Sequence, residues 1–416
     1  MLRARNPNRR DIAAAVLPPS ILRKILFVFG TRPEAVKLCP LVLHLRRHRE
    51  FEARACVTAQ HRGMLDQVLA AFGVIPDYDL DLMQPGQSLA QLTARILSKL
   101  EPVIAWERPD MLLVQGDTTT TFSGALAGFY QNVPVGHVEA GLRTGDLAQP
   151  FPEELNRVLS TRMAALHFAP TTAAAENLFA EGVPRARVCV TGNTGIDAVL
   201  HVRNALAAGR MPAQAWPQLD PAKKLIVVTA HRRESFGDGL ERICEALALL
   251  AERSDVQIVF PVHRNPRVME TVYRRLHGLP NVLLIEPLDY IPFVDLMRRA
   301  YLLITDSGGV QEEGPSLGKP ILVLREKTER PEAVAAGTVK LVGTDGERIV
   351  GEASRLLCDS AAYRSMARMH NPYGDGRASG RIRKAMAAYF AEREPGLSAS
   401  RPAAEVRSRS GYAAGR

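Results

Sequence analysis

The chain alternates short apolar runs with amphipathic stretches over most of its length, and this alternation constrains its fold more than any other feature. The apolar runs are rich in β-branched residues and end in Gly, Asp, Thr or His, whereas the stretches between them have helical spacing. Buried parallel strands wound with helices produce this pattern. We therefore predict strands at 24–29, 53–58, 111–115, 133–138, 166–169, 188–191, 225–229, 256–262, 282–285, 301–305 and 321–324.

A chain of 416 residues exceeds what one hydrophobic core usually serves. We predict an α/β fold of two doubly wound, Rossmann-like parallel-sheet domains that face a cleft. The expected divisions are a disordered basic extension (1–22), an N-terminal α/β domain (23–195), a C-terminal α/β domain (196–370), a C-terminal helix able to cross back to the first domain (371–392) and a disordered tail (393–416).

The formal net charge of +9 lies mostly in the two ends of the chain, which hold nine arginines and two acids in residues 1–23 and 395–416. The body is nearly neutral, so we expect no nucleic-acid partner. No apolar run is long enough for a membrane span, and the run at 12–17 is too short for a signal peptide. Five scattered cysteines predict reduced thiols and a cytoplasmic location, with neither a disulfide framework nor a zinc site.

In open parallel sheets, ligands bind outside the carboxyl ends of the strands, so polar residues directly after strands are candidates for function. The first such segment is FVFGTRPEAVK, where Gly30 follows a strand and Pro33 suits the start of a helix. Arg32 and Lys37 then lie near a helix N-terminus that already favours an anion. They are candidate phosphate contacts, although a surface arginine and lysine beside a turn would look the same.

Acidic residues follow the next strands of the first half, in QGDTTTT, GHVEAGLRTGD and PFPEELNR. One acid after a strand is often only a helix cap, but three acidic loops in succession suggest more. Carboxylates grouped in a partly dry cleft can take different protonation states, as acid and base catalysis requires. Arg143 and Arg157 could hold these acids or a phosphate. The acids are Asp117, Glu139, Glu153 and Glu154.

Two segments of the second half repeat the arrangement of a strand followed by a polar turn. His231 ends a strand in VVTAHRRESFGDG, and His263 does so in FPVHRNP. In LLITDSGGVQEEG, Ser307, Gly308 and Gly309 form a small-residue turn where a diphosphate could approach the backbone at a helix N-terminus. Glu313 is placed to accept hydrogen bonds from ribose hydroxyls.

Several common cofactor and hydrolase motifs do not occur. Neither GTRPEA nor GNTGID completes GxGxxG, and GxxxxGK[ST], HExxH and GxSxG are missing from the sequence. A nicotinamide cofactor, ATP hydrolysis, zinc proteolysis and serine hydrolysis are therefore unsupported. We expect no cofactor and no metal.

Nine segments together carry a more specific signal: GTRPEAVK, TAQHRGMLDQVL, GDTTTT, GHVEAGLRTGD, PFPEELNR, GNTGIDA, HRRESFG, TDSGGVQEE and TERPEAV. In this order they resemble the bacterial non-hydrolysing UDP-N-acetylglucosamine 2-epimerases, from about residue 24 to about residue 382. The architecture also resembles the GT-B fold of nucleotide-sugar glycosyltransferases. The resemblance implies a homodimer that interconverts UDP-N-acetylglucosamine and UDP-N-acetylmannosamine for bacterial surface polysaccharide synthesis, by elimination of UDP to 2-acetamidoglucal and re-addition.

The resemblance also implies roles for individual residues. Asp117, Glu139 and Glu153 match the catalytic acids of the family, with His231 beside them, and which acid is the base stays open. The UDP-sugar contacts would come from the second domain and from the cleft. They match Arg32, Lys37, Arg157, Phe293, Ser307, Gly308, Gly309, Glu313 and Arg330, while Leu288 stands where relatives can carry glutamine and would offer uracil its backbone.

The family further has a regulatory UDP-N-acetylglucosamine site beside the active site. Its positions match Gln60, His61, Arg62, Arg232 and His263, but Gly63 replaces a longer polar residue, which weakens the expectation of allosteric activation. Alternatives within enzymes are a GT-B glycosyltransferase, a hydrolysing epimerase and a 2-epimerase of a related UDP-diacetamido sugar. A UDP-sugar sensor is the non-enzymatic alternative, and the three acidic loops argue against it.

Overall fold

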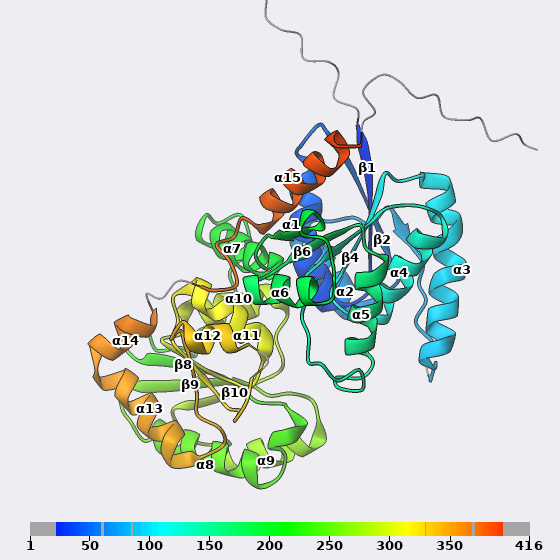
Figure 1. Cartoon of the computed structure of the whole chain (residues 1–416). Helices are drawn as coiled ribbons and strands as arrows, with labels where there is room; N and C mark the ends of the chain where they lie inside the picture. Colours follow the sequence, from blue (N-terminus) through cyan, green and yellow to red (C-terminus); the bar gives the residue numbers. More distant parts are fainter. Residues whose placement is uncertain (1–21, 60–61, 85, 329, 368–370, 394–416) are drawn as a thin grey trace, which may run out of the picture.

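Two parallel sheets form the framework of this protein (Figure 1). The structure is a computed structural model that describes residues 22–59, 62–84, 86–328, 330–367 and 371–393. The seven-stranded sheet has the order β3-β2-β1-β4-β5-β6-β7, and the six-stranded sheet has the order β10-β9-β8-β11-β12-β13. The strand order of the first sheet reverses between β1 and β4. That of the second sheet reverses between β8 and β11. The predicted α/β fold of two doubly wound parallel-sheet units is confirmed.

The observed strands match the predicted runs closely, with ends that differ by one or two residues. Two short edge strands, β3 and β13, were not predicted, because neither YD nor VKL is a continuous apolar run. The first sheet contains β1 (Arg23–Phe29), β2 (Phe51–Val57), β3 (Tyr78–Asp79), β4 (Met111–Gln115), β5 (Val135–Val138), β6 (Leu166–Ala169) and β7 (Val188–Val190). The second contains β8 (Lys224–Thr229), β9 (Val256–Pro261), β10 (Val282–Ile285), β11 (Leu302–Thr305), β12 (Ile321–Val323) and β13 (Val339–Leu341).

Helices connect the strands, and their starts follow from local sequence. Ser88, Thr118, Thr171, Asn193 and Asn265 each cap a helix by accepting a backbone N–H with the side chain. The helices up to the second sheet are α1 (Arg32–Arg46), α2 (Arg62–Phe72), α3 (Leu89–Glu107), α4 (Thr119–Tyr130), α5 (Glu153–Met163), α6 (Thr172–Ala180) and α7 (Thr194–Ala207). The later helices are α8 (Asp238–Ala251), α9 (Pro266–Leu276), α10 (Tyr290–Arg299), α11 (Gly308–Glu313), α12 (Pro331–Ala335), α13 (Gly346–Cys358), α14 (Ser360–Ala367) and α15 (Ala378–Ala391).

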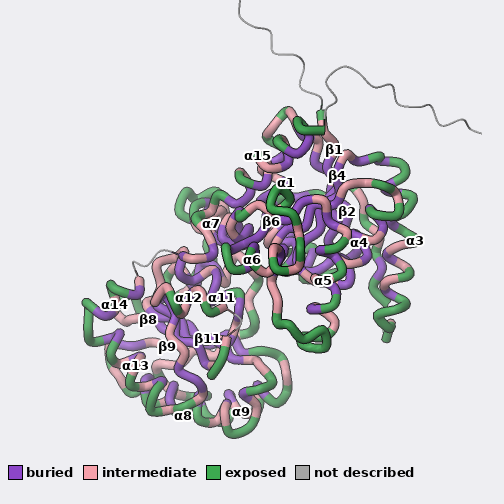
Figure 2. Tube along the Cα trace, in the orientation of Figure 1, coloured by how far each residue is buried: buried purple, intermediate pink, exposed green. Residues whose placement is uncertain are grey.

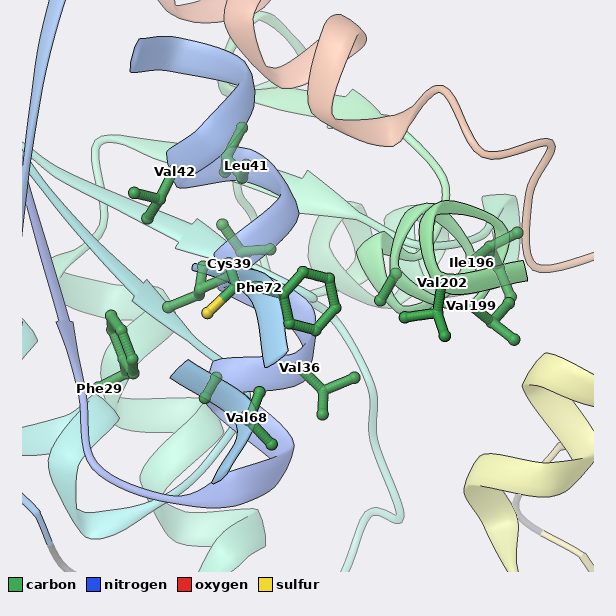
Figure 3. Close-up of a cluster of buried hydrophobic side chains, with 14 of the residues drawn as sticks. Phe29, Val36, Cys39, Leu41, Val42, Val68, Phe72, Ile196, Val199 and Val202 are labelled. Carbon is green, nitrogen blue, oxygen red and sulfur yellow. The ribbon is translucent and has the colours of Figure 1, made fainter. Parts of the chain in front are cut away.

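The cores lie along the strands, which are largely buried in both sheets (Figure 2). In the first domain, α1 packs between the sheet and α7, and Figure 3 shows Val36 and Cys39 of α1 among neighbours from β1, α2 and α7. Burying this continuous apolar surface is the main force that holds α1 in place. The N-terminus of α1, which carries Arg32, is thereby fixed at the carboxyl edge of the sheet.

Two segments link the sheets. Helix α7 follows the last strand of the first sheet, and it contacts α1 and α15 as well as α10 and α11. After the second sheet, the chain returns so that the carbonyl of Tyr373 accepts the N–H of Asn193 at 2.7 Å, and α15 then packs on α1 and α7 (Figure 1). An ion pair from Arg383 to Glu50 joins α15 to the first domain. The predicted tails lie almost wholly outside the described residues.

Among the described residues, no helix is both long and apolar enough to span a membrane. All five cysteines are free. Cys39, Cys56 and Cys244 are buried, Cys189 is half-buried and Cys358 is exposed.

Candidate active site

The segments that follow β1, β4, β8 and β11 flank the points where strand order reverses, and each of them carries residues singled out by the sequence. The chain enters these segments at Gly30, Gly116, Ala230 and Asp306. Ligands bind at such points in open α/β sheets. The structure thus contains one such position in each domain.

Glu34 joins the loop after β1 to the loop after β4. Its Oε2 accepts the backbone N–H groups of Gly30 at 3.0 Å and Thr31 at 2.7 Å, while its Oε1 accepts the hydroxyl of Thr118 at 2.7 Å. The side chain is buried, and burial raises the pKa of Glu34 despite these hydrogen bonds. The segment that carries Arg32 and Lys37 is therefore fixed relative to the segment that carries Asp117.

Glu139 follows β5 and is the most constrained of the acids. Its backbone has φ of 64°, a conformation that costs a non-glycine residue free energy, so the surrounding contacts must hold it. Its carboxylate accepts hydrogen bonds from the ammonium group of Lys37 and from the side-chain amide of Gln115. Burial raises the pKa of Glu139, an effect that Lys37 opposes and the nearby carboxylate of Glu312 reinforces. Glu139 is thus a buried carboxylate able to hold or release a proton.

Asp117 follows β4 and pairs with Arg157, which is one of the two roles that the sequence allowed for that arginine. Nη2 of Arg157 lies 2.8 Å from Oδ2 of Asp117. Burial raises the pKa of Asp117, Arg157 and Lys37 lower it, and Glu153 at the start of α5 raises it. Asp117 and Glu139 also influence each other electrostatically. The structure therefore groups the three predicted acids in one electrostatic environment.

Glu154 has a structural role beside this group. It is 1% exposed, and its Oε1 accepts the backbone N–H groups of Thr144 and Gly145 at 3.0 and 3.1 Å. Its other oxygen lies 3.4 Å from Nε of Arg157. Glu154 therefore holds the loop before α5 and orients the arginine that contacts Asp117.

Arg143 does not join the acids, contrary to the sequence-based interpretation. Its guanidinium binds both carboxylate oxygens of Glu181, at 2.5 and 3.0 Å, and donates to the hydroxyl of Thr161 at 2.9 Å. Proximity in sequence to Glu139 was misleading because the chain turns away at Gly141, and the arginine then reaches the end of α6. Its role is to tie α5 and α6 together.

His231 follows β8 and lies against Asp306, which follows the neighbouring strand β11. Nδ1 of His231 is 3.2 Å from Oδ1 of Asp306, and Oδ2 of Asp306 accepts the backbone N–H groups of His231 and Arg232 at 2.6 and 2.7 Å. Asp306 is fully buried, and the ring of His231 stacks on His263 with 5.5 Å between centroids. Burial lowers the pKa of His231, whereas Asp306 raises it. A proton on Nδ1 would face Asp306 and leave Nε2 for a ligand.

The turn after β11 provides the expected small-residue approach to a helix. Ser307 precedes α11, and Gly308 and Gly309 begin it. A Cβ added to Gly308 would lie 2.5 Å from the guanidinium carbon of Arg330, so only glycine leaves that arginine its place over the helix N-terminus. Arg330, Ser307 and the two glycines, all predicted UDP contacts, are thus neighbours.

The predicted nucleoside-binding residues lie close to this turn. Oε1 of Glu313 is 3.4 Å from the hydroxyl of Tyr290, and burial raises the pKa of Glu313 to about 8. Leu288 and Phe293 are half-buried and, like Tyr290, pack against the core. The positive charge of Arg32, in the first domain, lowers the pKa of both Glu313 and His231, so Arg32 faces the second domain.

The residues matched to a regulatory site are only partly brought together. Gln60 and His61 lie outside the described residues. Arg62 forms ion pairs with Asp66, Asp79 and Asp81, and a side chain at Gly63 would meet nothing within 4 Å. Arg232 and His263, by contrast, both lie beside His231, as their positions after β8 and β9 require.

Three residues of this region were not singled out by sequence reasoning: Glu34, Asp306 and Glu312. Glu34 had a recognisable signal, since T-x-x-E at a helix start is a capping box, which the structure contains. Asp306 directly follows a strand, as the chosen acids do. Glu312 is adjacent to Glu313 in α11, and spacing alone does not show which of two neighbouring helix residues faces the site.

Two doubly wound sheets, with carboxylates on one side and a glycine turn on the other, define a GT-B-like α/β enzyme. The glycosyltransferase of kitacinnamycin shares this fold, with a TM-score of 0.57 at 13% identity over 88% of this chain and 98% of its own. The chain belongs to the UDP-N-acetylglucosamine 2-epimerase family, whose model matches residues 43–387.

Individual members of the family support this membership. The UDP-N-acetylglucosamine 2-epimerase of Salmonella typhimurium is 58% identical over 371 residues, which is 88% of this chain and 99% of the relative. The crystal structure of UDP-GlcNAc 2-epimerase from Neisseria meningitidis bound to UDP-GlcNAc is 48% identical, with a TM-score of 0.80 over 88% of this chain and 100% of the other.

Proposed function

We propose that this chain catalyses the reversible C2 epimerisation of UDP-N-acetylglucosamine to UDP-N-acetylmannosamine, by elimination of UDP and re-addition. The observation that carries the proposal is the half-buried group of Asp117, Glu139 and Glu153, in which Lys37 pairs with Glu139 and Arg157 with Asp117. The phosphate contacts would come from Arg330 and the turn at Ser307–Gly309. The product would supply bacterial surface polysaccharide synthesis.

The chemistry explains why both a base and an acid are needed. C1 of the sugar is an acetal carbon, so the C2 proton is not acidic and simple deprotonation is too costly. In the elimination, a carboxylate takes the C2 proton, the C2–H electrons form the C1–C2 double bond, and the C1–O bond breaks to release UDP. In the return step, UDP oxygen attacks C1 and C2 takes a proton on the opposite face. One base and one acid on opposite sides of the ring suffice.

Retention of UDP distinguishes this reaction from hydrolysis. The glycal must stay beside UDP, so phosphate contacts and catalytic acids have to be held together across the two domains. Asn193, at the start of α7, donates to Glu312 of α11 at 2.9 Å, a direct contact between the two sides. Such contacts between the domains favour a site that keeps UDP and the glycal bound until UDP adds back.

The proposal is tested by incubating the protein with UDP-N-acetylglucosamine in deuterated water and following the sugar by NMR. We expect deuterium at C2 and the manno isomer still attached to UDP. Free N-acetylmannosamine would indicate a hydrolysing epimerase. Unchanged, unlabelled substrate that reacts only when an acceptor is added would indicate a glycosyltransferase, and binding without any exchange would indicate a sensor. A related UDP-diacetamido sugar run in parallel tests substrate choice.

The protein is also proposed to form a homodimer through the adjacent ends of α3 and α4. Trp106, Phe129 and Tyr130 are 81%, 59% and 68% exposed there, and the side chain of Gln131 bonds the carbonyl of Glu101, so the two ends are neighbours. Exposed aromatic clusters of this kind mark protein interfaces. Figure 1 shows α3 at the edge of the first domain, away from the second sheet, where a partner would leave the site accessible.

Replacing Trp106 and Tyr130 together by glutamate is expected to convert a dimer to a monomer, because two charges would be buried without partners in the interface. Light scattering after gel filtration measures the mass. Ile75→Glu, at a residue that is 79% exposed elsewhere, is the matched control and should stay dimeric. A monomeric unmodified protein, or a dimer that survives the double change, would contradict this interface.

Allosteric activation by the substrate is proposed for the surface beside His231. A ligand that contacts His263 or Arg232 would lie against His231 and could alter its position, since His263 stacks on that ring. Sigmoidal dependence of the rate on UDP-N-acetylglucosamine, with a lag in the reverse direction, is the expected result. Hyperbolic kinetics in both directions would exclude it.

Free cysteines at all five positions favour a reducing, cytoplasmic setting for the enzyme.

A further inference from the structure

Glu312 lies between the two halves of the site and contacts both. It is 6% exposed on α11, the helix that begins at the glycine turn. Its Oε1 accepts a hydrogen bond from Nε of Arg330 at 2.7 Å. Its Oε2 accepts one from Nδ2 of Asn193 at 2.9 Å and lies 3.8 Å from Nζ of Lys37. One oxygen therefore faces the second domain and the other faces the first.

The two first-domain partners of Glu312 also hold Glu139. Lys37 forms an ion pair with Glu139, and Nδ2 of Asn193 lies 3.4 Å from Oε1 of the same carboxylate. The orientation of Asn193 is fixed, because its Oδ1 caps α7 by accepting the N–H of Gly195 at 2.8 Å. Two carboxylates thus share one ammonium group and one amide. A change that draws the ammonium group of Lys37 toward Glu312 therefore weakens the ion pair between Lys37 and Glu139.

Arg330 connects this network to the diphosphate contacts. Its guanidinium lies over Gly308 at the N-terminus of α11 while Glu312 accepts from its Nε. A diphosphate bound at that turn would compete for the guanidinium, since phosphate oxygens are strong acceptors for arginine. Glu312 would then depend more on Lys37 and Asn193 for its hydrogen bonds. A buried carboxylate cannot forgo such partners without a large cost in free energy.

We propose that Glu312 is a positioning residue through which the binding of a diphosphate at Arg330 is transmitted to Glu139 in the first domain. This inference rests on the proposed function. It adds that the carboxylate of Glu139 is protonated more readily when UDP is present, because UDP draws Arg330 away from Glu312 and Lys37 away from Glu139. Glu139 would then be in the protonation state that the reaction needs only while UDP is bound.

The surrounding charges are consistent with this direction. The groups around the pair are Lys37, Arg330, Asp117 and Glu313, with the phenol of Tyr373 nearby. Glu312 raises the pKa of Glu139, whereas Lys37 lowers it. Lys37 and Arg330 keep the pKa of Glu312 low although burial opposes them. Glu312 is therefore the charged member of the pair. Once UDP engages Arg330, Lys37 and Asn193 would keep Glu312 charged, and Glu139 is the partner that would take the proton.

The experiment measures proton uptake when UDP binds, by isothermal titration calorimetry of the whole protein in buffers of different ionisation enthalpy. Glu139→Gln supplies the baseline, since it retains the protons released by UDP itself and lacks the responding carboxylate. We expect the unmodified protein to take up about half a proton or more beyond this baseline near the pKa of Glu139. Glu312→Gln should lose most of that difference while still binding UDP.

Asn193→Ser provides a second variant, because serine still caps α7 but lacks the bridging amide. It should reduce the uptake, with a normal unfolding midpoint, even if Glu312→Gln fails to fold. Equal uptake in the unmodified protein and in Glu139→Gln would overturn the inference and leave the epimerase proposal intact. Absence of UDP binding to the unmodified protein would contradict the proposed function itself.

Discussion

Replacing Glu139 by glutamine is expected to slow exchange of the C2 hydrogen of UDP-N-acetylglucosamine by about 10²–10⁴-fold. Glutamine has nearly the same shape and can occupy the same position, but it can neither accept nor donate a proton, and it cannot balance the charge of Lys37. UDP should bind largely as before, because the change leaves every proposed phosphate contact in place: Arg330 and the turn at residues 307–309 lie in the second domain, and Arg32 and Lys37 are unaltered. Exchange is measured by NMR in deuterated water, and UDP binding by calorimetry.

Glu347→Gln is the matched control for this prediction. Glu347 is an exposed residue in the first turn of α13, a helix that packs on α8 and α14, and its replacement should leave exchange unchanged. Asp117→Asn should resemble Glu139→Gln. Full exchange by Glu139→Gln would show that Glu139 is a structural acid, and loss of UDP binding would show that it organises the phosphate contacts instead.

Replacing Gly141 by alanine is expected to lower the free energy of unfolding by about 3 kcal/mol or more. Gly141 follows the Glu139 turn with φ of 93°, and an added Cβ would lie 2.1 Å from the carbonyl oxygen of Ala174. That oxygen belongs to the backbone of the first turn of α6, so it cannot rotate aside as a side chain could. Either the Glu139 turn or α6 must move.

Urea unfolding followed by circular dichroism measures this effect. Gly351→Ala is the control, since Gly351 is an exposed residue within α13 and an added Cβ meets nothing within 4 Å. That change should stabilise the protein by up to about 1 kcal/mol, because alanine has the higher helix propensity. An unchanged unfolding midpoint for Gly141→Ala would mean that the turn after β5 can adopt another conformation, and Glu139 would then not be held as described.

The strand assignments and the polar ends of strands were predictable because each depends on a short stretch of chain. The runs of β1, β4 and β11 are mostly apolar, and the residues that follow them are polar or small. Once the strands are parallel, their carboxyl ends must share an edge of the sheet. Asp117 and Glu139 could therefore be expected near each other before their contacts were known.

Arg143 and Glu34 illustrate what could not be predicted in this way. Arg143 is four residues from Glu139 in sequence, yet its partner Glu181 lies at the end of α6. Glu34 has a recognisable capping role, but its bond to Thr118 depends on the order in which β1 and β4 pair. Sequence separation gives no information on such contacts, because the sheet brings distant loops together.

The sequence by itself determined the two parallel sheets, the loops that carry function and the family, since periodicity, strand ends and local motifs are properties of short segments. Only the tertiary structure decided how charges are shared among those loops. Lys37 lies between Glu139 and Glu312, and Asp306 lies behind His231, because domains and neighbouring strands pack them together. Burial there excludes water, and the nearest charged group then governs whether each carboxylate or imidazole holds its proton.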